Sequence, residues 1–120
     1  MRSILLAASL IALSASTAFA ADDVMANYYG NTVIASGGMV DTHSYYNADH
    51  TFTVKAPAVG MEFKGTWKIE GGNLCRTYDS PPPGISNPLC TPAEAHKVGD
   101  TWTMSANGKS RTLTLLKGVQ

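Results

Sequence analysis

The sequence lacks any run of neighbouring basic residues longer than a pair, and its 9 Lys and Arg are balanced by 9 Asp and Glu. Nucleic-acid binding depends on concentrated positive charge that displaces counterions from phosphates. Electrostatic attachment to an anionic membrane needs a similar basic cluster. We therefore expect no nucleic-acid partner and no charge-driven contact with a lipid surface.

A long apolar run is also missing, apart from one short stretch at the N-terminus. Met1 and Arg2 give a positive start, and the apolar stretch after them is too short for a stable membrane span. Ala18 and Ala20 form a typical small-residue cleavage site, and no cysteine lies near it to carry a lipid. The sequence therefore predicts a signal peptide over residues 1–20, with no membrane anchor after cleavage. We expect the protein in the bacterial periplasm or outside the cell.

The rest of the chain is short enough for one domain. We divide it into an N-terminal tail at residues 21–30 and a single β-barrel-like domain at residues 31–120, and we expect a monomer. Cys75 and Cys90 are the only 2 cysteines. Because exported chains meet an oxidising compartment, and a redox pair would need closer spacing, the two predict a structural disulfide.

Helical periodicity is missing after the signal peptide, and period-two alternation with turn dipeptides takes its place. Asn107-Gly108 is the strongest short hairpin signal. Short turns make neighbouring strands antiparallel. The sequence predicts an all-β fold, a small antiparallel eight-stranded meander barrel with one disulfide; a β-sandwich is the alternative. The expected strands are residues 31–36, 39–46, 50–55, 61–70, 73–78, 89–91, 101–106 and 109–117.

Alternation along residues 61–70 assigns the two faces of that strand, because successive side chains point to opposite sides of a sheet. The inward face is expected to carry Met61, Phe63, Gly65, Trp67 and Ile69, and the charged residues between them face water. Trp102 and Met104 follow the same pattern. Gly65 lies mid-strand, where glycine marks a bulge, a bend or the close approach of another group.

Gly65-Thr66-Trp67 resembles the Gly-x-Trp signature of lipocalin and avidin-like (calycin) β-barrels. A small secreted barrel with one disulfide also resembles periplasmic inhibitors of proteases and of lysozyme. The resemblance covers residues 45–75 and implies a ligand cavity at the open end of a barrel.

Catalytic and metal-binding motifs are missing as well. Gly84-Ile85-Ser86 lacks the second glycine and the strand-to-helix setting of a nucleophile elbow. Met39, Asp41 and His43 could offer ligands to a metal, but no paired spacing supports them. We expect no enzyme, no metal and no cofactor.

Two binding functions remain. In the first, the barrel holds a small apolar or aromatic ligand between Met61, Phe63, Trp67, Trp102 and Met104. In the second, the protein is a periplasmic inhibitor or interaction module, which contacts a partner protein through a proline-rich loop or through the N-terminal tail. The disulfide would clamp this loop, in which we name Pro81, Pro82, Pro83 and Ile85 as contact residues.

Overall fold

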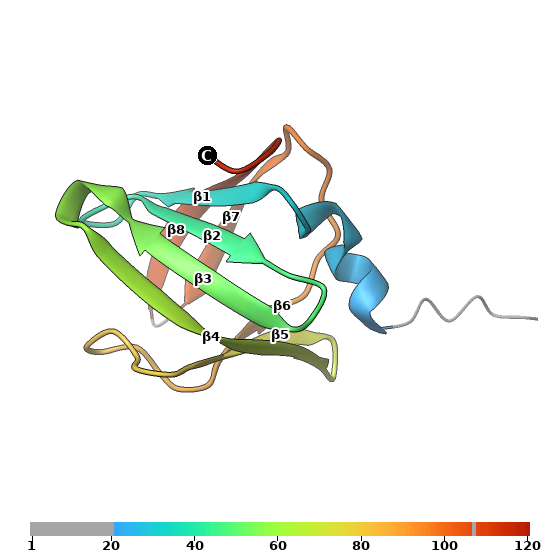
Figure 1. Ribbon diagram of the computed structural model, residues 1–120, viewed down its shortest axis with the longest axis horizontal. Helices are drawn as coiled ribbons and strands as arrows, with labels where there is room; N and C mark the ends of the chain where they lie inside the picture. The colour runs from blue at the N-terminus through green and yellow to red at the C-terminus, as the bar shows by residue number, and fades with distance from the viewer. Residues whose placement is uncertain (1–20, 107) are drawn as a thin grey trace, which may run out of the picture.

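A computed structural model describes residues 21–106 and 108–120. In this part of the chain, eight β-strands and two short 3₁₀ helices follow one another (Figure 1). The predicted signal peptide and Asn107 of the predicted hairpin turn lie outside the described residues. The helices are η1 (Ala21–Tyr28) and η2 (Pro57–Val59), and the strands are β1 (Thr32–Ser36), β2 (Thr42–Tyr46), β3 (Thr51–Ala56), β4 (Met61–Glu70), β5 (Asn73–Tyr78), β6 (Leu89–Pro92), β7 (Thr101–Ala106) and β8 (Lys109–Leu116).

The strands form one antiparallel sheet in the order β6-β5-β4-β3-β2-β1-β8-β7. Strands β1 to β6 are a meander, and β8 returns to pair with β1. The sheet curls into a half-barrel. Among the described residues no ladder joins β6 to β7, so one seam stays open. The prediction of an antiparallel eight-stranded meander with one disulfide is confirmed.

One strand begins later than expected. We expected residues 39–46 to be extended, but β2 begins at Thr42. The side chain of Met39 is 99% exposed and lies in the connection between β1 and β2. Gly37 adopts a φ of 92° there, and the Arg111 guanidinium lies against Gly38, where a Cβ would stand only 2.4 Å from Nη2. The chain therefore leaves the sheet at these glycines, and Met39 does not share a strand face with His43.

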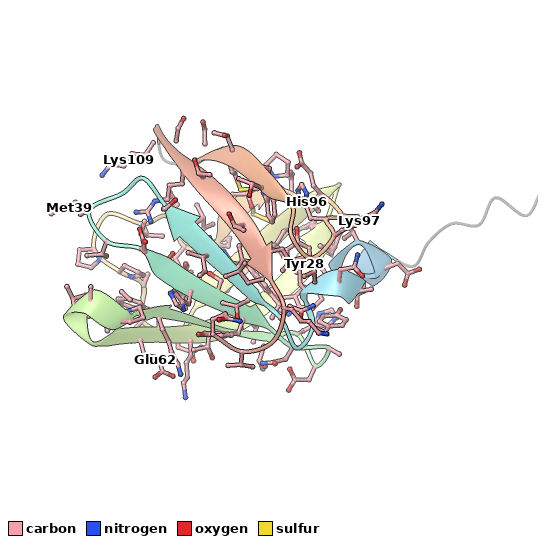
Figure 2. The ribbon with its side chains drawn as sticks, turned by 90° about the horizontal axis from the view of Figure 1, so that it is seen from above. Tyr28, Met39, Glu62, His96, Lys97 and Lys109 are labelled. Carbon is pink, nitrogen blue, oxygen red and sulfur yellow. A yellow bond between two sulfur atoms is a disulfide. The ribbon has the colours of Figure 1, made fainter. Side chains whose placement is uncertain are left out.

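The connections between strands gather at two ends of the half-barrel, because successive strands run in opposite directions. We call one the closed end: it holds η1 and the connections 47–50, 71–72 and 93–100. The other is the open end, formed by the connections 37–41, 57–60 and 79–88. Figure 2 shows Tyr28 and His96 together at the closed end, with Met39 and Lys109 at the opposite one.

The expected faces of β4 are confirmed for most of its length. Trp67 is 2% exposed and Gly65 is buried, whereas the charged residues between the inward positions are exposed. Met61 is the exception, with 47% of its surface exposed, because it lies at the open end where the walls stop. The buried core is completed from the other strands and from η1 by Met25, Tyr28, Val33, Tyr46, Phe52, Val54, Leu74, Tyr78, Leu89 and Leu115.

Gly65 is required by close approach of its neighbours. A Cβ at this position would lie 1.9 Å from the carbonyl oxygen of Thr77 and 2.9 Å from Cε1 of Phe52. Gly65 stands opposite Phe52 on β3 and opposite Tyr78 on β5. The ring of Phe52 thus occupies the space that a side chain at 65 would need.

The predicted disulfide is confirmed. Cys75 and Cys90 face each other across β5 and β6 and are bonded. Beyond them, the side-chain amide of Asn87 accepts a hydrogen bond from the backbone N–H of Tyr78 and donates one to its carbonyl, at 2.8 and 3.1 Å. The base of the proline-rich loop is therefore held by a covalent bond and by a two-point hydrogen bond.

Candidate ligand-binding cavity

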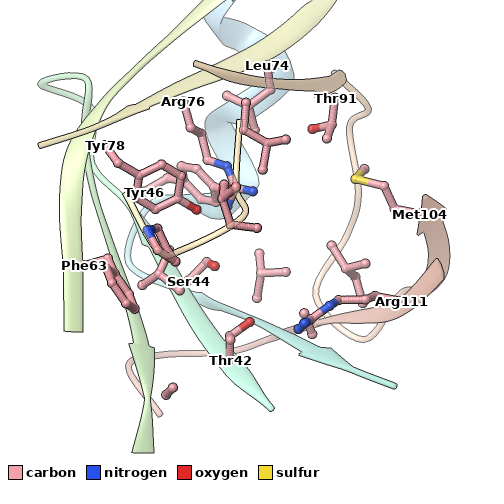
Figure 3. A pocket seen from close by; sticks show the side chains of 18 of the residues that line it. Thr42, Ser44, Tyr46, Phe63, Leu74, Arg76, Tyr78, Thr91, Met104 and Arg111 are labelled. Carbon is pink, nitrogen blue, oxygen red and sulfur yellow. The ribbon is translucent and has the colours of Figure 1, made fainter. Parts of the chain in front are cut away.

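A cavity of about 500 Å³ occupies the interior of the half-barrel (Figure 3). Its walls come from inward-facing positions of all eight strands, and its floor comes from Met25 and Tyr28 of η1. The lining is mostly aliphatic, aromatic and thioether. At the open end the cavity is bordered by Val40, Val59, Met61, Pro82, Pro83 and Lys109.

The structure brings four predicted ligand-binding residues together. Met61, Phe63, Trp102 and Met104 all line the cavity, the first two from β4 and the others from β7. Trp67 does not line it. Its indole Nε1 donates to the carbonyl of Asn47 at 3.0 Å, and His50 stacks on its ring with centroids 4.1 Å apart. Trp67 is a closed-end core residue, because alternation places it inside but nearer to the β2–β3 turn.

The proline-rich loop contributes to the rim of the cavity. Pro82, Pro83 and Ile85 line the cavity, and Ile85 also packs against the core. Pro81 is exposed and lies outside the lining. The backbone N–H of Ile85 donates to the carbonyl of Pro82 at 3.2 Å, which folds the loop back toward the barrel. Three of the residues expected to contact a partner protein thus face the cavity.

The N-terminal tail closes the other end. Met25 is 1% exposed, and the Tyr28 hydroxyl donates to the carbonyl of Glu94 at 2.8 Å. The side chain of Asn27 donates to the carbonyl of His96 at the same distance. These bonds join η1 to the connection between β6 and β7, so the tail is part of the packed structure at the closed end.

Arg76 extends into the cavity from β5, and sequence reasoning missed it. Its Nη1 donates to the Tyr46 hydroxyl at 3.3 Å, and its guanidinium carbon lies 5.9 and 5.8 Å from the ring centroids of Phe52 and Tyr78. Figure 3 shows the Arg76 side chain close to Tyr46 and Tyr78. The signal was present in the sequence: Leu74, Arg76 and Tyr78 share one face of β5, and apolar neighbours on both sides mark that face as inward.

No carboxylate in the described part of the chain lies within ion-pair distance of Arg76. Burial raises the pKa of the neighbouring Tyr78 phenol, which therefore stays neutral and cannot act as a counterion. Because an arginine side chain is not deprotonated in proteins, the interior carries a fixed positive charge. Phe52 and Tyr78 offset part of its desolvation through cation–π contacts.

Other charges of the lining add to this positive field. Arg111 enters from β8, opposite the β5 wall (Figure 3), and Lys109 lies at the rim. The lining also includes Glu94, whose carboxylate lies 3.2 Å from His96 Nε2 and so already has a partner. The cavity therefore combines an apolar surface with unbalanced positive charge.

Two buried side-chain donors in the described residues have no hydrogen-bond partner, Nε of Arg76 and Nε1 of Trp102. Both residues line the cavity. His96 stacks on the Trp102 ring with centroids 3.5 Å apart, and Tyr28 meets that ring edge-on. Packing thus fixes the indole while its N–H stays unpaired. An unpaired buried donor is costly, and in a native structure it calls for a specific explanation.

The metal hypothesis gains no ligand set. Nδ1 of His43 lies 3.5 Å from the carbonyl of Gln120, and Met39 is outside β2. Across residues 21–106 and 108–120, no three His, Cys, Asp or Glu side chains gather closely enough to hold a metal ion.

Neither helix in residues 21–106 and 108–120 has the length and apolarity needed to cross a membrane. Comparison with family models, with curated proteins and with solved structures finds no match to this chain.

Proposed function

We propose that this protein is an exported, non-enzymatic binding protein that holds one small apolar molecule inside its half-barrel. The observation that carries the proposal is the cavity of about 500 Å³ with a mainly apolar lining. Ligand pockets are typically about 300–1,000 Å³ and are lined by apolar side chains with a few polar groups. An eight-stranded barrel can equally be filled by its own side chains, so the presence of this space favours a ligand.

The composition of the walls supports the same function. Met61 and Met104 flank the cavity, and methionine adapts its shape to ligands because it is unbranched and polarisable. Export is part of the proposal: the disulfide is consistent with an oxidising compartment, and residues 1–20 read as a signal peptide. A lipocalin-like assignment, suggested by Gly65-Thr66-Trp67, is supported by the curled meander of strands.

Tryptophan fluorescence tests the proposal, since Trp102 lines the cavity and Trp67 does not. Dodecanol is a suitable probe because it is apolar, uncharged and non-fluorescent. We expect titration with dodecanol to shift the emission of the wild-type protein and of a Trp67→Phe variant. The Trp102→Phe variant should show no shift while still binding the neutral dye N-phenyl-1-naphthylamine. If wild type bound neither dodecanol nor the dye, the proposal would be removed.

Filling the cavity gives a second, independent prediction. Ser44 is 6% exposed, lies on β2 and lines the cavity. In a Ser44→Leu variant the larger side chain would occupy ligand space, so we expect dodecanol affinity to fall at least about tenfold. The melting temperature should hold or rise, because the added surface is buried. Thr66→Leu, on the exposed outer face of β4, is the matched control and should bind normally; equal affinity in both variants would place the ligand elsewhere.

A further inference from the structure

We infer that the ligand of the cavity is an amphipathic carboxylate whose charged group pairs with Arg76. The inference rests on the proposed function, since it assigns the chemical class of the molecule in the same cavity. It starts from the two unpaired donors, the Arg76 Nε and the Trp102 Nε1. No buried side-chain acceptor in the described residues is left unpaired in the same way. Each of these two donors therefore lacks an acceptor oxygen, which a ligand in the cavity can bring.

The hydrogen-bonding geometry of Arg76 leaves room for such a group. One nitrogen of the guanidinium is used, by the hydrogen bond from Nη1 to the Tyr46 hydroxyl. Arginine offers five N–H donors in a planar fork that matches a carboxylate with two parallel hydrogen bonds. The rings of Phe52 and Tyr78 hold the fork in place from the sides. A carboxylate would meet a donor group that is already oriented and largely desolvated.

Charge balance points to a monoanion. Arg76 carries one positive charge among apolar side chains and has no carboxylate partner in the described residues. A buried charge is stable when it is paired, so a single negative charge on the ligand completes the site. Arg111 and Lys109, nearer to the open end, add a positive field along the route from solvent and favour the approach of an anion.

The shape of the cavity sets the orientation of the ligand. Met25 and Tyr28 line the cavity at the closed end, so a molecule reaches it from the open end or through the seam between β6 and β7. Arg76 lies mid-strand on β5 and pairs with the closed-end residue Trp67, whereas Met61 begins β4 at the open end. The carboxylate enters first and pairs with Arg76, and the apolar body extends along Phe63 toward the rim formed by Pro82 and Pro83.

Dodecanoate and dodecanol test this inference because they share one chain and differ in the charged group. At pH 7 a carboxylic acid of ordinary pKa is ionised. Affinities are measured on the oxidised protein by displacement of the neutral dye N-phenyl-1-naphthylamine, which introduces no charge preference. We expect dodecanoate to bind about 10- to 100-fold more tightly than dodecanol, the range that a charge-assisted hydrogen bond supplies.

Four variants locate the preference. Arg76→Met removes the charge but keeps an apolar side chain of similar length, and it should bind both probes with equal affinity. Arg111→Met, on the β8 wall, and Lys64→Met, on the outer face, should keep most of the preference. Arg76→Lys keeps the charge but loses the planar fork of donors, so its preference for dodecanoate should be intermediate. If Arg76→Met does not fold, Arg76→Lys takes its place in the test.

The outcomes separate the inference from the function on which it rests. Equal affinity of wild type for dodecanoate and dodecanol would overturn the inference and leave the proposed function intact. A preference for dodecanoate that survives in Arg76→Met would also overturn it, because a residue other than Arg76 would then bind the carboxylate. Binding of neither probe would overturn both proposals.

Discussion

Replacing Gly65 by alanine is expected to lower the free energy of unfolding by more than about 3 kcal/mol, which is large for one methyl group. The added Cβ would lie 1.9 Å from the carbonyl oxygen of Thr77, a backbone atom that its own strand holds in place. Phe52 would also have to move, since its ring already touches the position. Relief of the contact with Thr77 requires β4 and β5 to separate. Relief of the contact with Phe52 requires that ring to shift within the core. Urea unfolding followed by far-UV circular dichroism measures the change.

Thr66→Ala is the matched control for this prediction. Thr66 is the next residue on β4 and is exposed on the outer face, so its truncation should change stability by less than about 0.5 kcal/mol. If Gly65→Ala and Thr66→Ala unfold at the same urea concentration, the close approach seen at Gly65 does not constrain the sheet.

Removing the disulfide with Cys75→Ala and Cys90→Ala together is expected to cost roughly 3 kcal/mol. The two cysteines are 15 residues apart, and the cross-link limits the conformations of the unfolded chain over that loop. For a domain of this size the loss corresponds to a fall in melting temperature of roughly 12–24 °C. Differential scanning calorimetry without reductant gives the comparison with wild type.

The effect should extend to the cavity, because the same bond holds the base of the loop that carries Pro82 and Pro83. We expect dodecanol affinity to weaken severalfold at a temperature where the double variant is still folded. Wild type treated with reductant should have the same melting temperature as the double variant. If the reduced wild type melts at the oxidised value instead, the bond adds no stability.

The arrangement of strands was predictable because one face of the sheet is buried and the other is not. The alternation along residues 61–70 reappears in the structure as buried Trp67 and exposed Lys68, and the turn glycines mark where strands end. The exception in β2 lies at residues 39–41, which belong to the connection after β1: Val40 borders the cavity there and Met39 is exposed. Their neighbours Gly37 and Gly38 turn the chain away, a tertiary effect that periodicity does not contain.

The contents of the site were only partly predictable. Alternation tells whether a side chain points inward, but it does not tell how far along the barrel the side chain lies. Trp67 and Trp102 are therefore equivalent in sequence, and only the structure separates a closed-end core residue from a cavity residue. Arg76 was missed for another reason. Charged residues are rarely buried, so an arginine is read as solvent-facing unless the alternation along β5, which puts it on the same face as Leu74 and Tyr78, is followed.

The part played by η1 was also outside the reach of local patterns. Residues 21–28 are too few for a clear amphipathic signature, and their place is set by contacts with residues far along the chain. Tyr28 and Asn27 bond to carbonyls of residues 94 and 96, on the connection that precedes β7. Nothing in the local sequence around Tyr28 indicates which distant segment will receive it.

The pairing of β1 with β8 has a consequence for the order of folding. Every other ladder joins strands that follow each other in the chain, so it needs only a local loop closure. The β1–β8 ladder joins the first strand to the last, and contacts of this separation slow folding because a long loop must be ordered first. The curled wall can therefore be completed only after β8 has been synthesised. A chain with this topology keeps β1 without its second neighbour until the whole meander and β8 are available.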